Sequence, residues 1–139
     1  MKYAVAYYTR SGNTKKVAET IAEILGVTPF DISEGMSEKA DVLFLGSSLY
    51  AFTYDPAVEK FIQENSNYIG KIVSFSTSAS GKSTAKFVKE TAEKNGIDFY
   101  NHAYKCYGKF GILNANRPNE KDLEQAREFT KTVVAELGE

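Results

Sequence analysis

The chain has 139 residues, with 17 lysines and arginines against 18 aspartates and glutamates and a formal net charge of −1. This length fits one domain with a buried core, and the interspersed charges offer no basic face for nucleic acid. The single cysteine excludes an internal disulfide and a cysteine-rich metal site, and the apolar run after Lys2 is too short for membrane insertion. We therefore expect a single cytoplasmic domain over residues 1–139 that has no metal site.

The first half of the chain alternates strand and helix patterns. An apolar run predicts a strand over residues 2–8, and apolar residues at helical spacing predict a helix from Asn13 to Leu25 that ends at Gly26. A short second strand follows near residues 28–32. Residues 40–46 form a continuous apolar run of the kind that helices cover on both faces, so this third strand is expected at the centre of the sheet.

The same alternation continues to the end of the chain. Asp55-Pro56 predicts the start of a helix, with Asp as the N-cap, and residues 71–75 predict the fourth strand. A helix from about Ser83 precedes the fifth strand at 98–107, and the last helix follows Asn119. Strands that alternate with helices favour right-handed crossovers, so the chain predicts an α/β fold with a doubly wound, five-stranded parallel sheet.

The junction between the first strand and the first helix has the composition of a phosphate-binding loop. Residues 9–14 read Thr-Arg-Ser-Gly-Asn-Thr, so three hydroxyl side chains flank Gly12. Glycine lets the backbone curl, and successive N–H groups and the positive end of the helix then converge on one anion. The alternative is an ordinary helix start in which Asn13 or Thr14 caps the helix.

Two further loops are expected beside this one. In a doubly wound sheet, ligands bind beyond the carboxyl ends of the strands, where the strand order reverses. Residues 47–54 offer aromatic side chains, and residues 76–83 offer small hydroxyl groups and backbone amides. The three loops together predict a ligand with an aromatic ring system and a phosphate tail.

These segments resemble the flavodoxins, which are small FMN-binding electron carriers. The resemblance rests on residues 9–14, 46–50 and 75–81 and on the closing stretch from Gly108 to Glu120, so it covers nearly the whole chain. It implies a flavodoxin-like, three-layer α/β/α fold with strand order 2-1-3-4-5. It also implies an FMN cofactor, redox partner proteins as electron donor and acceptor, and a monomer.

The resemblance also implies which residues bind FMN. Tyr50 is the expected stacking residue, with Phe52 or Tyr54 as alternatives, although these aromatic side chains could instead pack under the following helix. Arg10 would either contact the phosphate or point to solvent. The implied set is Thr9, Arg10, Ser11, Gly12, Asn13 and Thr14 at the phosphate, Ser47, Ser48, Leu49, Tyr50, Ala51 and Phe52 on one side of the ring, and Thr77, Ser78, Ala79 and Gly81 on the other.

Three features depart from the usual flavodoxin pattern. The net charge of −1 is far less acidic than is usual for flavodoxins. Residues 47–54 contain no glycine, where flavodoxins commonly use one to flip a peptide towards the half-reduced flavin, so we expect that state to be less stabilised. Residues 76–83 contain no aromatic side chain, so one face of the flavin is expected to be open unless Tyr104 or Tyr107 covers it.

Two functions remain in competition. The first is an electron carrier in which the flavin does the chemistry and no side chain acts as a catalyst. The second is an FMN-dependent quinone or protoporphyrinogen reductase on the same fold, which an open flavin face favours. Cys106 is interpreted as a buried thiol and His102 as a strand side chain. Residues 80–83 mimic the end of a nucleotide-binding P-loop, but Ser76 stands where that motif needs glycine.

Overall fold

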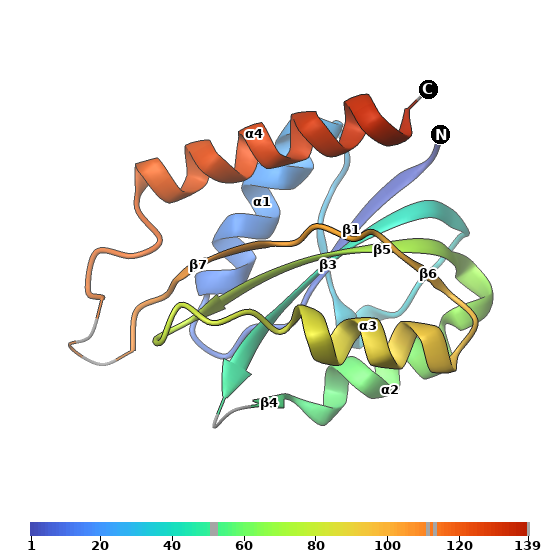
Figure 1. The fold of residues 1–139 in the computed structure, drawn as a ribbon, viewed down its shortest axis with the longest axis horizontal. Helices are drawn as coiled ribbons and strands as arrows, with labels where there is room; N and C mark the ends of the chain where they lie inside the picture. The colour runs from blue at the N-terminus through green and yellow to red at the C-terminus, as the bar shows by residue number, and fades with distance from the viewer. Residues whose placement is uncertain (51–52, 111, 113, 139) are drawn as a thin grey trace.

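A central parallel sheet with helices on both faces forms the molecule (Figure 1). This computed structural model describes residues 1–50, 53–110, 112 and 114–138. In chain order, the elements are β1 (Tyr3–Tyr7), α1 (Asn13–Leu25), β2 (Phe30–Asp31), a 3-10 helix (Ile32–Glu34), β3 (Ala40–Tyr50), β4 (Thr53–Tyr54), α2 (Pro56–Glu64), a 3-10 helix (Ser66–Tyr68), β5 (Ile69–Ser78), α3 (Ala85–Lys94), β6 (Asp98–Phe99), β7 (Tyr104–Tyr107) and α4 (Glu120–Leu137).

The strand order confirms the expected topology. The sheet runs β2-β1-β3-β5-β6, all in parallel, and β7 continues beyond β6 along the same edge of β5. This is the order 2-1-3-4-5 when β6 and β7 are counted together as the fifth strand. None of the helices in the described parts of the chain combines the length and apolarity needed to cross a membrane.

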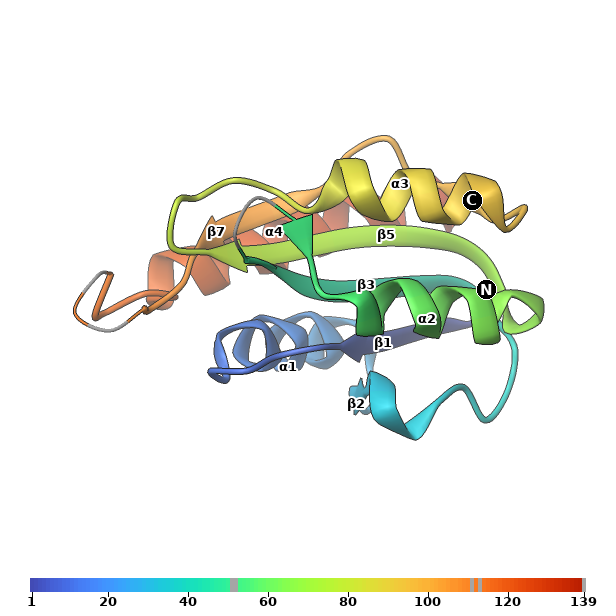
Figure 2. The same ribbon diagram turned by 90° about the horizontal axis from the view of Figure 1, so that it is seen from below.

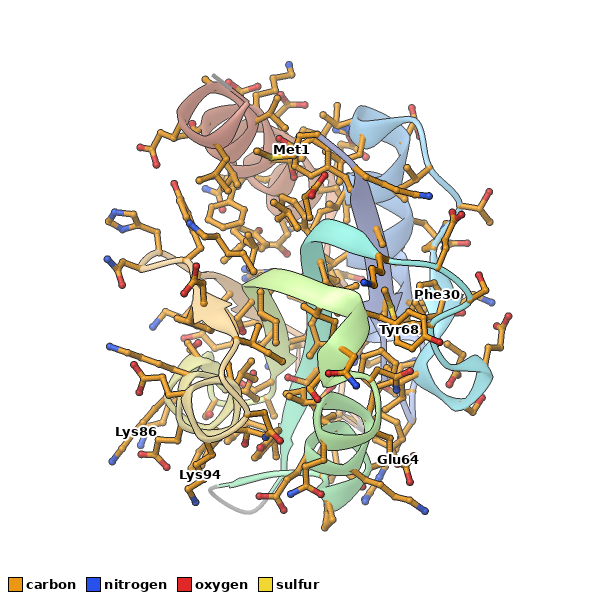
Figure 3. All side chains as sticks on the ribbon, turned by 90° about the vertical axis from the view of Figure 1, so that its right-hand side faces the viewer. Met1, Phe30, Glu64, Tyr68, Lys86 and Lys94 are labelled. Carbon is orange, nitrogen blue, oxygen red and sulfur yellow. The ribbon has the colours of Figure 1, made fainter. Side chains whose placement is uncertain are left out.

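Two apolar cores hold the layers together. On one face of the sheet, α1 and α4 bury side chains such as Ile21 and Val133 against Phe44. On the other face, α2 and α3 bury side chains that include Ile62 and Val88. Figure 2 shows α2 and α3 in front of the sheet, with α4 behind it. Figure 3 looks onto the amino ends of the strands, where Met1 and Tyr68 lie.

The fifth strand is broken, which the sequence did not predict. Phe99 pairs with Ile72 and Tyr104 pairs with Phe75. Between these two pairs the edge strand advances by five residues, whereas β5 advances by only three. The extra residues leave the ladder between β6 and β7. His102 is exposed in this break, so its interpretation as a strand side chain was wrong.

Cys106 is the buried thiol that the sequence predicted. It lies on β7 in the core under α4, and burial raises its pKa to about 11. A thiol with so high a pKa is almost wholly protonated at neutral pH and is a poor nucleophile.

The start of α4 is fixed by an ion pair between the half-buried Arg117 and the buried Asp122. Arg117 donates from Nε and one terminal nitrogen to the Asp122 carboxylate, at 2.5 and 2.6 Å. Asn119 caps the helix through reciprocal hydrogen bonds with Asp122. Burial would raise the pKa of Asp122, but the hydrogen bonds from Arg117 and Asn119 outweigh it and hold that pKa below its ordinary value.

We predict that Asp122→Ala lowers the free energy of unfolding by about 3 kcal/mol at neutral pH, because it removes the ion pair with Arg117 and the acceptor of the Asn119 N–H, although Asn119 still caps the helix. Because the folded pKa is depressed, this stabilisation is complete above the ordinary carboxyl pKa and is lost as pH falls through the folded pKa. Urea unfolding at pH 7 and at about pH 3 measures both effects. Glu124→Ala, which breaks an exposed pair with Arg127, is the control. A gap between wild type and Asp122→Ala that stays constant with pH would contradict this account.

Candidate functional site

A cleft of about 550 Å³ lies at the carboxyl ends of β1, β3 and β5. Four chain segments line it, and three of them are the loops that the sequence predicted. The lining residues are Arg10, Ser11 and Asn13 before and in α1, Ser48 and Leu49 on β3, residues 77–80 and Lys82 after β5, and residues 108–110 after β7.

Three hydroxyl groups meet at the floor of this cleft. Parallel pairing places Ser48 opposite Thr77, and the fully buried Thr14 of α1 reaches both of them. The oxygen–oxygen distances are 2.8 Å from Thr14 to Ser48, 2.9 Å from Thr14 to Thr77 and 3.2 Å between Ser48 and Thr77. This hydroxyl triad ties α1 to the two central strands.

The first turn of α1 lies beside the cleft, and its backbone N–H groups have no acceptor within the helix. Gly12 is the N-cap with a positive φ of 89°, and no side chain caps the helix. Thr9 accepts a hydrogen bond from the Gly12 N–H, at 2.8 Å. The first N–H groups of a helix have no acceptor within the helix. The capping alternative is not observed, because Asn13 bonds to the Lys109 carbonyl and Thr14 belongs to the hydroxyl triad.

Arg10 lines the cleft and forms an ion pair with Asp55. Asp55 is also the N-cap of α2, as the sequence predicted. Its carboxylate accepts hydrogen bonds from the Ala57 N–H, Arg10 and Tyr8, and these lower the pKa of Asp55 in spite of its partial burial. The guanidinium of Arg10 is therefore already held by a carboxylate where it faces the cleft.

Residues 47–54, which the sequence predicted as a loop, divide between the cleft and the core, and β3 continues through their first half to Tyr50. Leu49 lines the cleft, whereas Ser47 is buried on the opposite side, with its hydroxyl 2.6 Å from that of Thr84. Tyr54 stacks on Phe87 and bonds to Thr91, so it packs under α3, away from the cleft. The Tyr50 side chain and the whole of Ala51 and Phe52 lie outside the described residues.

The segment after β7 supplies an aromatic side chain that the sequence analysis did not assign. Phe110 lines the cleft with 67% of its surface exposed. Tyr104 is buried under α4, and Tyr107 lies against Gly81, which does not itself line the cleft. The predicted topology could have identified this segment. In a parallel sheet, the chain that follows the fifth strand must lie at the same edge as the loops that follow the other strands.

Hydrogen bonds anchor this segment at both sides of the cleft. Asn13 donates to the Lys109 carbonyl at 2.9 Å, and the Gly108 N–H donates to the Ser78 carbonyl at 3.0 Å. The Asn114 amide donates to the Ala79 carbonyl, also at 3.0 Å. The chain around Phe110 is thus tied both to the start of α1 and to the loop after β5.

The composition of the cleft suits binding more than acid–base catalysis. Its described lining contains hydroxyls, amides, cations and apolar side chains, but no carboxylate and no imidazole. Within the parts of the chain that the structure describes, no cluster of His, Cys, Asp and Glu residues forms that could hold a metal ion. The lining can therefore hold an anion at one end and a flat, partly apolar group beside Leu49 and Phe110.

Comparisons with known proteins agree with this architecture. The family model described as "Flavodoxin domain" matches residues 4–104. An uncharacterised protein from Methanocaldococcus jannaschii is 31% identical over 135 residues, covering 88% of this chain and 90% of that protein. A solved structure of an archaeal flavodoxin is 22% identical, with a TM-score of 0.80 and complete coverage of both chains. Oxidised Flavodoxin 1 from Bacillus cereus is 18% identical, with a TM-score of 0.74 over 99% of each chain.

The hydroxyl triad provides a test of how the floor of the cleft is held. We predict that Thr14→Val costs about 1–2 kcal/mol of unfolding free energy, because it removes two buried hydrogen bonds at nearly constant volume. Thr14→Ser retains the hydroxyl and should recover much of this loss. Urea unfolding of the three proteins makes the measurement. A Thr14→Val protein as stable as the wild type would show that the triad does not hold α1 against the sheet.

Proposed function

The chain belongs to the flavodoxin domain family, and we propose that it binds FMN in this cleft and carries electrons between redox partner proteins. The observation that carries the proposal is the uncapped start of α1 at the end of a cleft with polar and apolar walls. When bound, FMN supplies the redox chemistry, so the protein needs only to hold the flavin and control access to it.

The residues at the cleft fit the two ends of FMN. The N–H groups of Ser11, Asn13, Thr14 and Lys15, the hydroxyl of Ser11 and the positive end of α1 suit its phosphate. Leu49 and Phe110 offer apolar surface to the ring system, and Tyr50 stays the proposed stacking residue. Thr77, Ser78 and Ala79 are small enough for a ring edge to approach their backbone. Ser47 and Gly81 drop out of the proposed contacts, because neither residue lines the cleft.

Thr9 and Thr14 take structural roles in this proposal. Thr9 closes the turn through Gly12, and Thr14 seats the helix through the hydroxyl triad. Their hydroxyls therefore hold the loop in the shape that presents its N–H groups. Direct phosphate contact would come from the backbone and from Ser11.

We predict that Gly12→Ala weakens FMN binding about tenfold. A side chain at positive φ costs about 1–2 kcal/mol, and relaxing that strain turns the N–H groups of the loop away from the phosphate. The space itself is free, since a Cβ on Gly12 would meet no atom within 4 Å. Fluorescence titration of FMN gives the affinity.

Gly26→Ala is the matched control for this measurement. Gly26 also has a positive φ, of 70°, and open space at its Cβ, but it lies at the other end of α1. Both variants should lose similar folding stability, and only Gly12→Ala should lose affinity. Equal affinities for the two variants would place the phosphate elsewhere.

A quinone or protoporphyrinogen reductase that uses FMN is the second candidate. The observation that favours it is the small size of residues 77–80, which line one wall of the cleft and include no aromatic side chain. A flat substrate would then reach the flavin from that side.

The dependence of rate on quinone concentration separates the two candidates. We expect the reduced, FMN-loaded protein to react with a small soluble quinone at a rate that rises linearly with concentration, because a carrier has no dedicated quinone site. Stopped-flow absorbance under anaerobic conditions gives this rate. Saturation at low quinone concentration would contradict the carrier and favour the reductase.

A further inference from the structure

The edge of the cleft carries two lysines besides Arg10. Three cationic side chains, Arg10, Lys82 and Lys109, line the cleft, and no carboxylate stands among its described lining residues. Arg10 is paired with Asp55. Lys82 and Lys109 are exposed, and neither forms an ion pair with another described residue. These two lysines therefore place two unpaired positive charges at the cleft, although the whole chain has a net charge of −1.

Apolar surface adjoins these lysines. Phe110 is 67% exposed and Ile112 is 95% exposed, and they follow Lys109 directly in the chain. Figure 1 shows the segment between β7 and α4 extending beyond the body of the domain, on the side where β5 ends. Exposed aromatic and cationic side chains beside one another are common at protein–protein contacts, where the aromatic side chain supplies much of the binding energy. We call Lys82, Lys109 and Phe110 the basic rim.

We propose that the basic rim is a docking surface for an acidic redox protein, whose carboxylates surround its electron-transfer centre. This inference rests on the proposed function. Opposite charges would steer the two proteins together, and Phe110 would supply buried apolar contact once they meet. Asn13 donates a hydrogen bond to the Lys109 carbonyl, and the Gly108 N–H donates one to the Ser78 carbonyl. These bonds hold this part of the basic rim in place before a partner binds.

Electron transfer to a matched pair of protein acceptors tests this charge preference. Native cytochrome c is basic, and cytochrome c with succinylated lysines has the same haem behind an acidic surface. Dithionite would supply two electrons to the bound FMN, which would take up two protons from water and become FMNH₂. Two haem Fe(III) centres then take one electron each and become Fe(II), while FMNH₂ returns to FMN and releases two protons.

We expect the succinylated acceptor to react faster than the native one at low ionic strength. Its rate constant should fall about tenfold or more as salt rises from about 10 mM to about 500 mM, because exposed charges are screened over a few ångströms at high salt. Lys82→Glu combined with Lys109→Glu should reverse the preference at saturating FMN. Lys39→Glu combined with Lys94→Glu makes the same change in net charge away from the cleft and should preserve it.

Other outcomes overturn the proposal. A faster reaction with native cytochrome c, or equal rates for the two forms, would show that the rim does not select acidic proteins. Charge dependence confined to ferricyanide, a small anionic acceptor, would mean that the lysines serve a small anionic substrate instead.

Calorimetric titration of the FMN-free chain with both cytochromes at low salt tests the surface without the flavin. We expect tighter binding of the succinylated form, weakened by the Lys82 and Lys109 substitutions. Equal affinities would overturn the docking proposal alone. A chain that prefers the acidic cytochrome but binds no FMN would instead overturn the proposed function.

Discussion

Thr14 reaches the floor of the cleft only because Gly46 has no side chain. A Cβ at position 46 would lie 2.3 Å from the Phe75 ring and 2.8 Å from Thr14 Cγ2. Contacts that short do not occur between carbon atoms in folded proteins, so any larger residue would push α1 or β5 outward. The hydroxyl triad, the position of the first turn of α1 and the depth of the cleft all depend on this close approach.

The parallel register then brings the loops to one place. Tyr7 pairs with Gly46, and Gly46 pairs with Phe75, so β1, β3 and β5 deliver their following loops to the same edge of the sheet. The cleft is thus a consequence of sheet geometry, and the side chains at the strand ends decide what it can bind. An open helix start gives it an end whose N–H groups suit an anion, and the segment after β7 gives it an aromatic edge.

The sequence predicted the parts of this arrangement that follow from local rules. Periodicity located the helices, and Asp55-Pro56 and Asn119 marked two of their starts correctly. The sequence did not show that Ser47 faces Thr84 or that Tyr54 packs under α3. A shift of one residue in strand register moves a side chain to the other face of the sheet, and the sequence does not give the register that exactly. Phe110 was missed for another reason: its place at the cleft depends on distant hydrogen bonds made by Asn13 and Asn114.

The central claim is that the start of α1 holds the phosphate of FMN. Amide ¹H–¹⁵N spectra recorded with FMN and with riboflavin, which lacks the phosphate, test it most directly. We expect FMN to shift the N–H signals of Ser11, Asn13 and Thr14 strongly. Riboflavin should shift the signals of the segments proposed to contact the ring, such as residues 77–79, but should leave the signals of Ser11, Asn13 and Thr14 unchanged. Equal shifts of these three signals with both ligands, or no shifts there with FMN, would contradict the account.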